Sequence, residues 1–155
     1  MDIHSFDVTS VWLADDDSDD LQTFEDCIKE IKPTVDLKIF RSGQELLNAL
    51  DHNPMPHLIF LDIRMPCRNG QECLAEIRSK RKYDRLPIII YSGSGYEIDI
   101  TYSYGVGANL YVRKPTTYFE MHNIIKKLLY LDWSKPEEIT STHFISGKYV
   151  PFMAQ

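Results

Sequence analysis

Three aspartates stand where their spacing and surroundings favour metal or phosphoryl chemistry. Asp15 and Asp16 directly follow the apolar run 11–14, and Asp62 directly follows the largely apolar run 57–61. Carboxylates about 4 Å apart repel one another by about 1 to 4 kcal/mol per pair, depending on the effective dielectric. A hard divalent cation offsets this repulsion, and Mg²⁺ commonly binds one or two carboxylates together with waters and phosphate oxygens. The aspartates therefore predict a Mg²⁺ site, provided that the fold brings them together.

A hydroxyl and an ammonium group follow two further apolar runs. Ser92 comes directly after the run 87–91, and Lys114 lies shortly after the run 110–112. In phosphoryl transfer, metal ions and cationic side chains balance the charge on the equatorial oxygens while a nucleophile attacks in line. Together with the aspartates, these residue types predict a phosphoryl-transfer site.

The segments between these residues predict an α/β fold of five strand–helix units. Apolar runs alternate with helical patterns, which favours a parallel sheet covered by helices. The second strand alternates apolar and charged residues, as an edge strand does, whereas the first, third and fourth are fully apolar and therefore central. Right-handed crossovers then give the flavodoxin-like, doubly wound strand order 2-1-3-4-5. The expected strands cover residues 11–14, 35–39, 57–61, 87–91 and 110–112, and the expected helices cover roughly 21–31, 42–50, 69–77, 96–104 and 117–131.

This strand order places the reactive side chains at the carboxyl end of the sheet. Ligands of open α/β sheets bind there, near the switch in strand order. The four strands concerned are neighbours at a spacing of about 4.8 Å, so we expect the five side chains to converge on one patch. Asp17, Asp19 and Asp20 are expected to remain solvated at the start of the first helix, where negative charge is favoured.

Composition and charge exclude several classes of protein. The chain has 155 residues, a formal net charge of −6 and a sequence pI of about 5.3, which argues against a nucleic-acid-binding surface. No apolar run approaches the roughly 18 residues that span a bilayer, and the first residues do not resemble a signal peptide. Cys27, Cys67 and Cys73 form no paired CxxC motif, which disfavours a disulfide framework and a zinc site. We expect a cytoplasmic protein without a membrane partner.

Four motifs at the predicted strand ends resemble the receiver domains of response regulators. They are Leu-Ala-Asp-Asp at 13–16, Leu-Asp-Ile-Arg-Met-Pro at 61–66, Tyr-Ser-Gly at 91–93 and Tyr-Val-Arg-Lys-Pro at 111–115. The resemblance covers roughly residues 10–131 and is strongest to bacterial receivers that stand alone. It implies a receiver domain at 1–132 and a C-terminal tail at 133–155 without an output domain. The tail is expected either to be disordered or to pack as an irregular strap through Phe144, Tyr149, Val150 and Phe152.

The resemblance assigns roles to the acidic residues. Asp62 is implied to be the phosphoacceptor, which attacks a phosphohistidine of a partner and forms an acyl phosphate. Mg²⁺ is implied to be held by Asp15, Asp16, Asp62 and the backbone carbonyl of Arg64. The bulk of the Arg64 side chain is expected to shield the acyl phosphate from water and so to slow dephosphorylation.

Three residues complete the implied machinery. Ser92 is implied to hydrogen-bond one phosphoryl oxygen, and Lys114 to pair with another. Tyr111 is implied to be an aromatic switch that turns inward when Ser92 moves toward the phosphate. The Lys114–Pro115 peptide bond is expected to be cis.

The implied function is that of a single-domain response regulator in a two-component phosphorelay. Its phosphodonor would be a sensor histidine kinase or a histidine phosphotransfer protein. The domain would catalyse its own phosphorylation and slow dephosphorylation, and would otherwise not be an enzyme. Its output would be a phosphorylation-dependent contact with a downstream protein target, and a homodimer through the face formed by 96–104, 110–112 and 117–131 is a further expectation. Tyrosines favour interfaces, and those of this region are Tyr96, Tyr102, Tyr104, Tyr111 and Tyr118.

Three other functions fit the sequence less well. A flavin-binding module of the same fold could hold a phosphate with Ser-Gly-Ser-Gly at 92–95, but the acidic cluster opposes an anionic cofactor. A hydrolase-type phosphatase with Asp62 as nucleophile would need an aspartate at the position of Arg64. A degenerate receiver that no longer takes phosphate would lack part of the site, whereas all five site residues are present.

Overall fold

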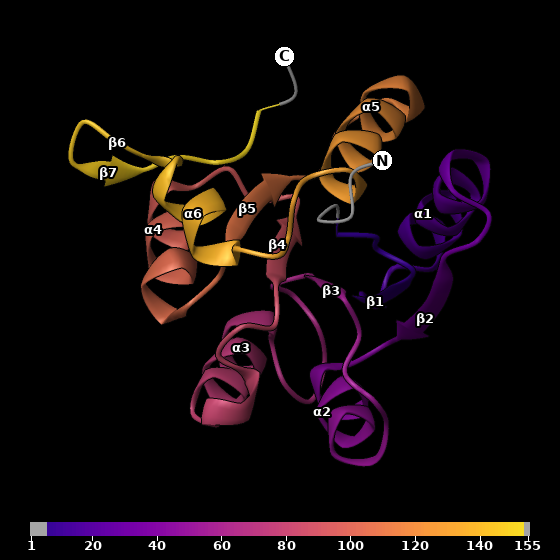
Figure 1. The fold of residues 1–155 in the computed structure, drawn as a ribbon, viewed down its shortest axis with the longest axis horizontal. Helices are drawn as coiled ribbons and strands as arrows, with labels where there is room; N and C mark the ends of the chain where they lie inside the picture. Colours follow the sequence, from indigo (N-terminus) through magenta and orange to yellow (C-terminus); the bar gives the residue numbers. More distant parts are fainter. Residues whose placement is uncertain (1–5, 154–155) are drawn as a thin grey trace.

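The computed structural model describes residues 6–153 and contains a five-stranded parallel sheet in the order β2-β1-β3-β4-β5 (Figure 1). The predicted α/β, flavodoxin-like topology is therefore confirmed. Of the three inner strands, β3 and β4 are buried along their whole length, whereas the edge strand β2 is half-exposed. The strands are β1 (Ser10–Ala14), β2 (Asp36–Phe40), β3 (Leu58–Leu61), β4 (Ile88–Ser92) and β5 (Leu110–Arg113).

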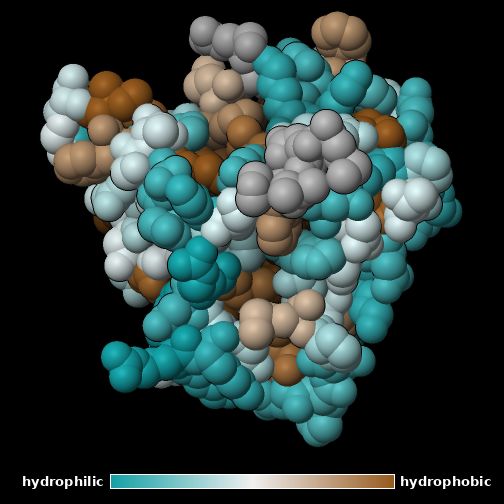
Figure 2. All heavy atoms as spheres, viewed as in Figure 1, coloured by the Kyte–Doolittle hydropathy of each residue, from teal (hydrophilic) through white to brown (hydrophobic). Residues whose placement is uncertain are grey.

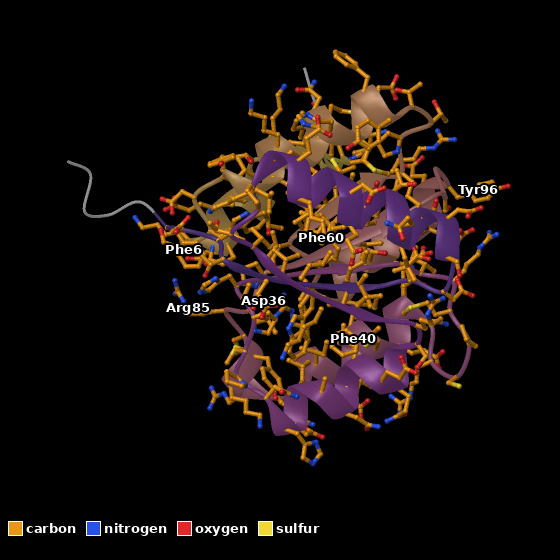
Figure 3. All side chains as sticks on the ribbon, turned by 90° about the vertical axis from the view of Figure 1, so that its right-hand side faces the viewer. Phe6, Asp36, Phe40, Phe60, Arg85 and Tyr96 are labelled. Atoms are coloured by element: carbon orange, nitrogen blue, oxygen red, sulfur yellow. The ribbon has the colours of Figure 1, made fainter. Side chains whose placement is uncertain are left out.

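Helices cover both faces of the sheet and divide the core into two clusters. Helices α1 and α5 pack on one face, and α2, α3 and α4 pack on the other (Figure 1). Phe60 lies in the first cluster, between the sheet and α1, and makes an edge-to-face contact with Phe24 of α1 (Figure 3). The helices are α1 (Ser18–Ile31), α2 (Gly43–His52), α3 (Gly70–Arg78), α4 (Glu97–Val106) and α5 (Tyr118–Leu129), and a short 3₁₀ helix spans Arg81–Tyr83.

Side-chain caps explain where four of these helices begin. Asp17, Ser42 and Thr117 each accept a hydrogen bond from a backbone N–H of the following turn, and Asn69 forms a capping box with Glu72. Helix α4 has no side-chain cap at Tyr96, and it packs against α3 and β5. It ends where Gly107 adopts a φ of 123°, a conformation that favours glycine.

The C-terminal tail packs against the domain as regular structure. Trp133 is buried, α6 (Pro136–Ser141) follows, and a hairpin joins β6 (Phe144–Ile145) to β7 (Lys148–Tyr149). Residues 133–149 thus hold a helix and a hairpin that the sequence did not suggest. Residues 150–153 follow as an irregular segment in which Phe152 packs against the core, as the irregular-strap alternative expected. The hairpin extends beyond α4, and apolar surface gathers on it (Figures 1 and 2). Phe144, expected to pack inward, is half-exposed there.

Three aromatic side chains pack at the amino end of the sheet, beside Arg85. His57 Nδ1 accepts hydrogen bonds from the backbone N–H groups of Thr9 and Ser10, and Phe6 packs edge-on against its ring at 5.5 Å. Trp133 lies beside this end, and its indole N–H donates to the carbonyl of Leu128 at 2.7 Å. Figure 3 shows Phe6 at this end of the sheet, with Tyr96 at the opposite end.

Within residues 6–153, none of the helices combines the length and the apolar character that crossing a membrane requires.

Candidate phosphoryl-transfer site

Lys114 is the centre of the charged cluster at the carboxyl end of the sheet. It directly follows β5, and its ammonium nitrogen lies 2.7 Å from Asp15 Oδ2 and 3.1 Å from Asp62 Oδ2. A third contact, at 2.8 Å, is made with Asp20 Oδ2 in the first turn of α1. One ammonium group therefore joins carboxylates from the ends of β1 and β3 and the start of α1.

Asp15, Asp16 and Asp62 form a candidate metal centre. One carboxylate oxygen of each lies within 4.8 Å of the other two. Asp15 is 1% exposed and Asp62 is 7% exposed, whereas Asp16 is open to solvent. Two buried carboxylates and one accessible carboxylate fit a hard divalent ion that keeps part of its water shell. The residues present therefore suit the expected ion.

The pKa values of this cluster follow from burial and mutual charge. Burial raises the pKa of Asp15 to about 6, although the hydrogen bond from Lys114 acts in the opposite direction. For Lys114, burial alone would lower the pKa, but the hydrogen bonds to Asp15 and Asp20 and the charge of Asp62 outweigh it. The pKa of Lys114 is therefore raised, and its ammonium group stays charged at neutral pH.

The backbone around Asp62 is tightly enclosed. The N–H of Asp62 donates to the carbonyl of Ala14 at 2.9 Å, and the N–H of Gly70 donates to the carbonyl of Ile63 at 2.7 Å. A Cβ atom at Gly70 would lie 2.0 Å from the carbonyl oxygen of Asp62. Position 70 therefore requires glycine, because the start of α3 lies directly against the chain that carries Asp62.

A pocket opens beside Asp62 toward the loop between β4 and α4. Ser92 lies at its wall and is 2% exposed, and its Oγ accepts a hydrogen bond from the N–H of Ser94 at 3.3 Å. Arg64 and Arg113 also line the pocket, and their positive charge suits an anionic ligand. The lining residues are Asp62, Arg64, Ser92, Gly93, Ser94, Gly95, Tyr96 and Arg113.

Tyr111 lies outside the charged cluster but is joined to its loop. Its side chain is fully buried, and its hydroxyl donates to the carbonyl of Ser94 at 2.8 Å. Its backbone N–H donates to the hydroxyl of Tyr104 at 3.1 Å. The structure thus brings Asp15, Asp62 and Lys114 into direct contact and connects Tyr111 to the pocket through Ser94.

Two features of the site differ from what the sequence suggested. Among residues 6–153 no peptide bond is cis, so the expected cis bond between Lys114 and Pro115 is wrong. The trans form is intrinsically preferred, and from it Lys114 already reaches both buried carboxylates. Asp20, expected to be solvated, is bound to Lys114. The signal for Asp20 was its place in the first turn of a helix that starts just after β1, directly over the carboxyl end of the sheet.

Comparison with known proteins identifies the family. Residues 11–126 match the family described as the response regulator receiver domain. The chain belongs to this family. It therefore contains the receiver domain of a response regulator in two-component signalling, and its fold is that of the receivers.

Individual relatives agree with this assignment. The response regulator Rcp1 of Synechocystis sp. (strain PCC 6803) is 26% identical over 122 residues, which cover 75% of this chain and 83% of Rcp1. The structure of the phosphorylated cyanobacterial phytochrome response regulator RcpA is also 26% identical, with a TM-score of 0.75 over 82% of this chain and 95% of RcpA. The Mn²⁺-bound form of Rcp1, 24% identical with a TM-score of 0.71 over 82% of this chain and 96% of that one, supports the fold.

Proposed function

We propose that Asp62 accepts a phosphoryl group from a phosphohistidine of a sensor histidine kinase or a histidine phosphotransfer protein. The observation that carries this proposal is the position of the Lys114 ammonium, 3.1 Å from Asp62 and 2.7 Å from Asp15, beside a pocket lined by Ser92. A carboxylate that is buried, paired with a permanent cation and open to a pocket on one side is a suitable nucleophile for this transfer.

The reaction follows from the positions of these groups. A carboxylate oxygen of Asp62 attacks the phosphorus atom, the phosphorus–nitrogen bond of the phosphohistidine breaks, and the imidazole leaves with the bonding electrons. The product is an acyl phosphate on Asp62. The Ser92 hydroxyl donates to one phosphoryl oxygen, and the Lys114 ammonium exchanges its contact with Asp62 for a contact with another phosphoryl oxygen. In this way Lys114 keeps its charge balanced throughout the transfer.

Mg²⁺ is the proposed resident ion of the site. Asp15, Asp16, Asp62 and the backbone carbonyl of Arg64 would hold it, and bound there it would supply positive charge to the phosphoryl oxygens. The convergence of three carboxylates supports the proposal. So does the Mn²⁺-bound structure of Rcp1, because Mn²⁺ and Mg²⁺ share a preference for oxygen ligands.

We further propose a cytoplasmic regulator whose receiver domain spans 1–132 and is followed by a tail at 133–155. Its output would be a phosphorylation-dependent contact with a downstream protein. The proposed surface for that contact and for a homodimer is the part of the face of α4, β5 and α5 that residues 148–153 leave open. Exposed apolar side chains on α4 and α5 support this: Ile98, Tyr102, Tyr118 and Phe119. No nucleic-acid or membrane partner is proposed.

Phosphorylation of the purified chain tests the central proposal. Incubation with Mg²⁺ and acetyl phosphate should add one phosphoryl group by intact mass, which the domain catalyses on itself. Asp62→Asn should abolish the gain, whereas Asp51→Asn should keep it, because Asp51 is an exposed acid of α2 that pairs with Lys80. No gain in the wild type, or an equal gain in Asp62→Asn, would contradict the proposal.

The same sample tests the expected slow dephosphorylation. Arg64 lines the pocket beside Asp62, where its side chain limits the approach of water to the acyl phosphate. After removal of acetyl phosphate, the added mass should therefore persist for minutes or longer. Loss within seconds would contradict the shielding role of Arg64 and leave the assignment of Asp62 intact.

A further inference from the structure

The last described residues of the tail run along the outer edge of β5. Residues 148–153, which we call the C-terminal strap, begin with β7 and continue past the end of α4. The N–H of Phe152 donates to the carbonyl of Tyr111 at 2.8 Å, and the carbonyl of Val150 accepts from the hydroxyl of Tyr104 at 2.9 Å. The strap therefore covers part of the outer edge of β5 and is joined to it by the backbone hydrogen bond of Phe152.

Tyr104 joins the strap to β5. Its hydroxyl donates to Val150 of the strap and accepts the backbone N–H of Tyr111, which uses the donor and one acceptor of the hydroxyl. Its ring stacks on the ring of Tyr149, with centroids 4.6 Å apart and planes inclined by 13°. Tyr104 is 5% exposed, so both contacts are made in a largely dry environment. Loosening of the strap would take the Val150 carbonyl from the Tyr104 hydroxyl and the Phe152 N–H from the Tyr111 carbonyl.

Tyr111 continues this connection to the phosphoryl pocket. The strap and Tyr104 bind its backbone carbonyl and N–H, and its own hydroxyl donates to Ser94. Ser94 in turn donates its N–H to Ser92 Oγ, and both serines line the pocket beside Asp62. An unbroken series of hydrogen bonds therefore leads from the strap to the wall of the pocket.

We propose that the strap holds Tyr111 in its inward, Ser94-bonded position, and that docking of the strap and phosphorylation of Asp62 favour one another. Tyr104 is the positioning residue of this coupling. The inference rests on the proposed phosphoacceptor function. The coupling is reciprocal by thermodynamic necessity: if docking of the strap strengthens binding of a phosphoryl group, the phosphoryl group strengthens docking by the same factor.

A single hydroxyl deletion tests the coupling. Tyr104→Phe removes the bridge between Tyr111 and Val150 but keeps the ring that stacks on Tyr149. The matched control is Tyr83→Phe, since Tyr83 is also buried and its hydroxyl donates to the carbonyl of Leu50 at 3.1 Å, away from the strap. Beryllofluoride, added with Mg²⁺ to the full chain, serves as the phosphoryl mimic, and its affinity is measured by calorimetry. Tyr104→Phe should weaken binding by about 5- to 20-fold, and Tyr83→Phe by less than about 2-fold.

Hydrogen exchange of the wild type gives a readout that loss of stability alone would not produce. Beryllofluoride should slow hydrogen exchange of the strap amides, including that of Phe152. The factor should be about the same as that by which Tyr104→Phe weakens beryllofluoride binding. Unchanged exchange in the strap, or equal affinities of the two variants, would overturn the strap proposal alone. Failure of the wild type to bind, or equal binding by Asp62→Asn, would overturn the phosphoacceptor function and the coupling with it.

Discussion

The two ends of the sheet are built in opposite ways. The carboxyl end buries Asp15 and Asp62 beside one ammonium group, so its charges are only partly balanced. The amino end is closed by Phe6, His57 and Trp133, where His57 Nδ1 and the Trp133 indole N–H form hydrogen bonds with the backbone. Buried charges are costly unless they are paired, whereas buried aromatic surface stabilises the fold. The comparison indicates that stability is concentrated at one end and reactivity at the other.

The largest expected effect is at the amino end. Trp133→Ala should lower the free energy of unfolding by about 3 to 5 kcal/mol, because it removes a fully buried indole and leaves a cavity. Trp133→Phe, which keeps an aromatic ring but loses the hydrogen bond to Leu128, should cost about 1 to 2 kcal/mol. Urea denaturation measures both. A loss below about 1 kcal/mol for the alanine variant would show that this end is not the stabilising one.

At the carboxyl end, in the Mg²⁺-free protein, we expect an intermediate effect of opposite sign: Asp15→Asn should raise the free energy of unfolding above that of the wild type. The pKa of Asp15 is raised from 3.8 to about 6 in the folded state. Between these values the folded state binds more protons than the unfolded state, so stability falls as the pH rises from about 4 to about 6. Asp15→Asn removes this loss of stability. The difference in free energy of unfolding between the variant and the wild type should therefore grow from about pH 4 to about pH 6 and stay constant at higher pH.

Between pH 4 and pH 7, the difference in free energy of unfolding should grow by about 1 to 3 kcal/mol in favour of Asp15→Asn. Urea midpoints of both proteins in EDTA, measured from pH 4 to pH 7.5, test this. Mg²⁺ should stabilise the wild type more than the variant and so reduce the difference. A difference that is independent of pH, or that shrinks as the pH rises, would contradict the view that Asp15 carries unbalanced charge.

The smallest expected effect separates Asp20 from its neighbour. Asp20→Asn removes one of the three carboxylates on Lys114 and should destabilise the protein by about 0.5 to 1 kcal/mol, since Asp20 is partly exposed. Asp19→Asn makes the same change of net charge in the same first turn of α1 and should cost less. Equal urea midpoints for the two variants would mean that Asp20 contributes only through the helix terminus.

The sheet was predictable because its strands are short apolar runs with clear ends. Each predicted strand boundary lies within one residue of the observed one, and the alternating charges of Asp36 and Lys38 identified β2 as the edge. The tail was not predictable. Its apolar residues follow no helical or strand period, and its order depends on contacts with Tyr104 and Tyr111 that only the tertiary structure supplies.

The site was predictable only as far as strand ends determine it. Parallel strands end at the same side of the sheet, which is why Asp15, Asp62 and Lys114 could be expected together. Asp20 and Arg113 reach the same region by the direction of their side chains, which depends on how α1 and β5 are oriented. Strand order does not determine such directions, so sequence patterns missed both residues.

The close contact at Gly70 has a consequence for the route that a signal can take. Because α3 abuts the main chain of Asp62, the peptide that bears the phosphoacceptor has no room to shift. A group newly attached to Asp62 must therefore be accommodated by its surroundings on the opposite side, where the serine loop after β4 and the lysine after β5 lie. The absence of a Cβ atom at position 70 thus lets α3 lie against the Asp62 main chain and leaves the serine loop and Lys114 as the groups that adapt to an added phosphoryl group.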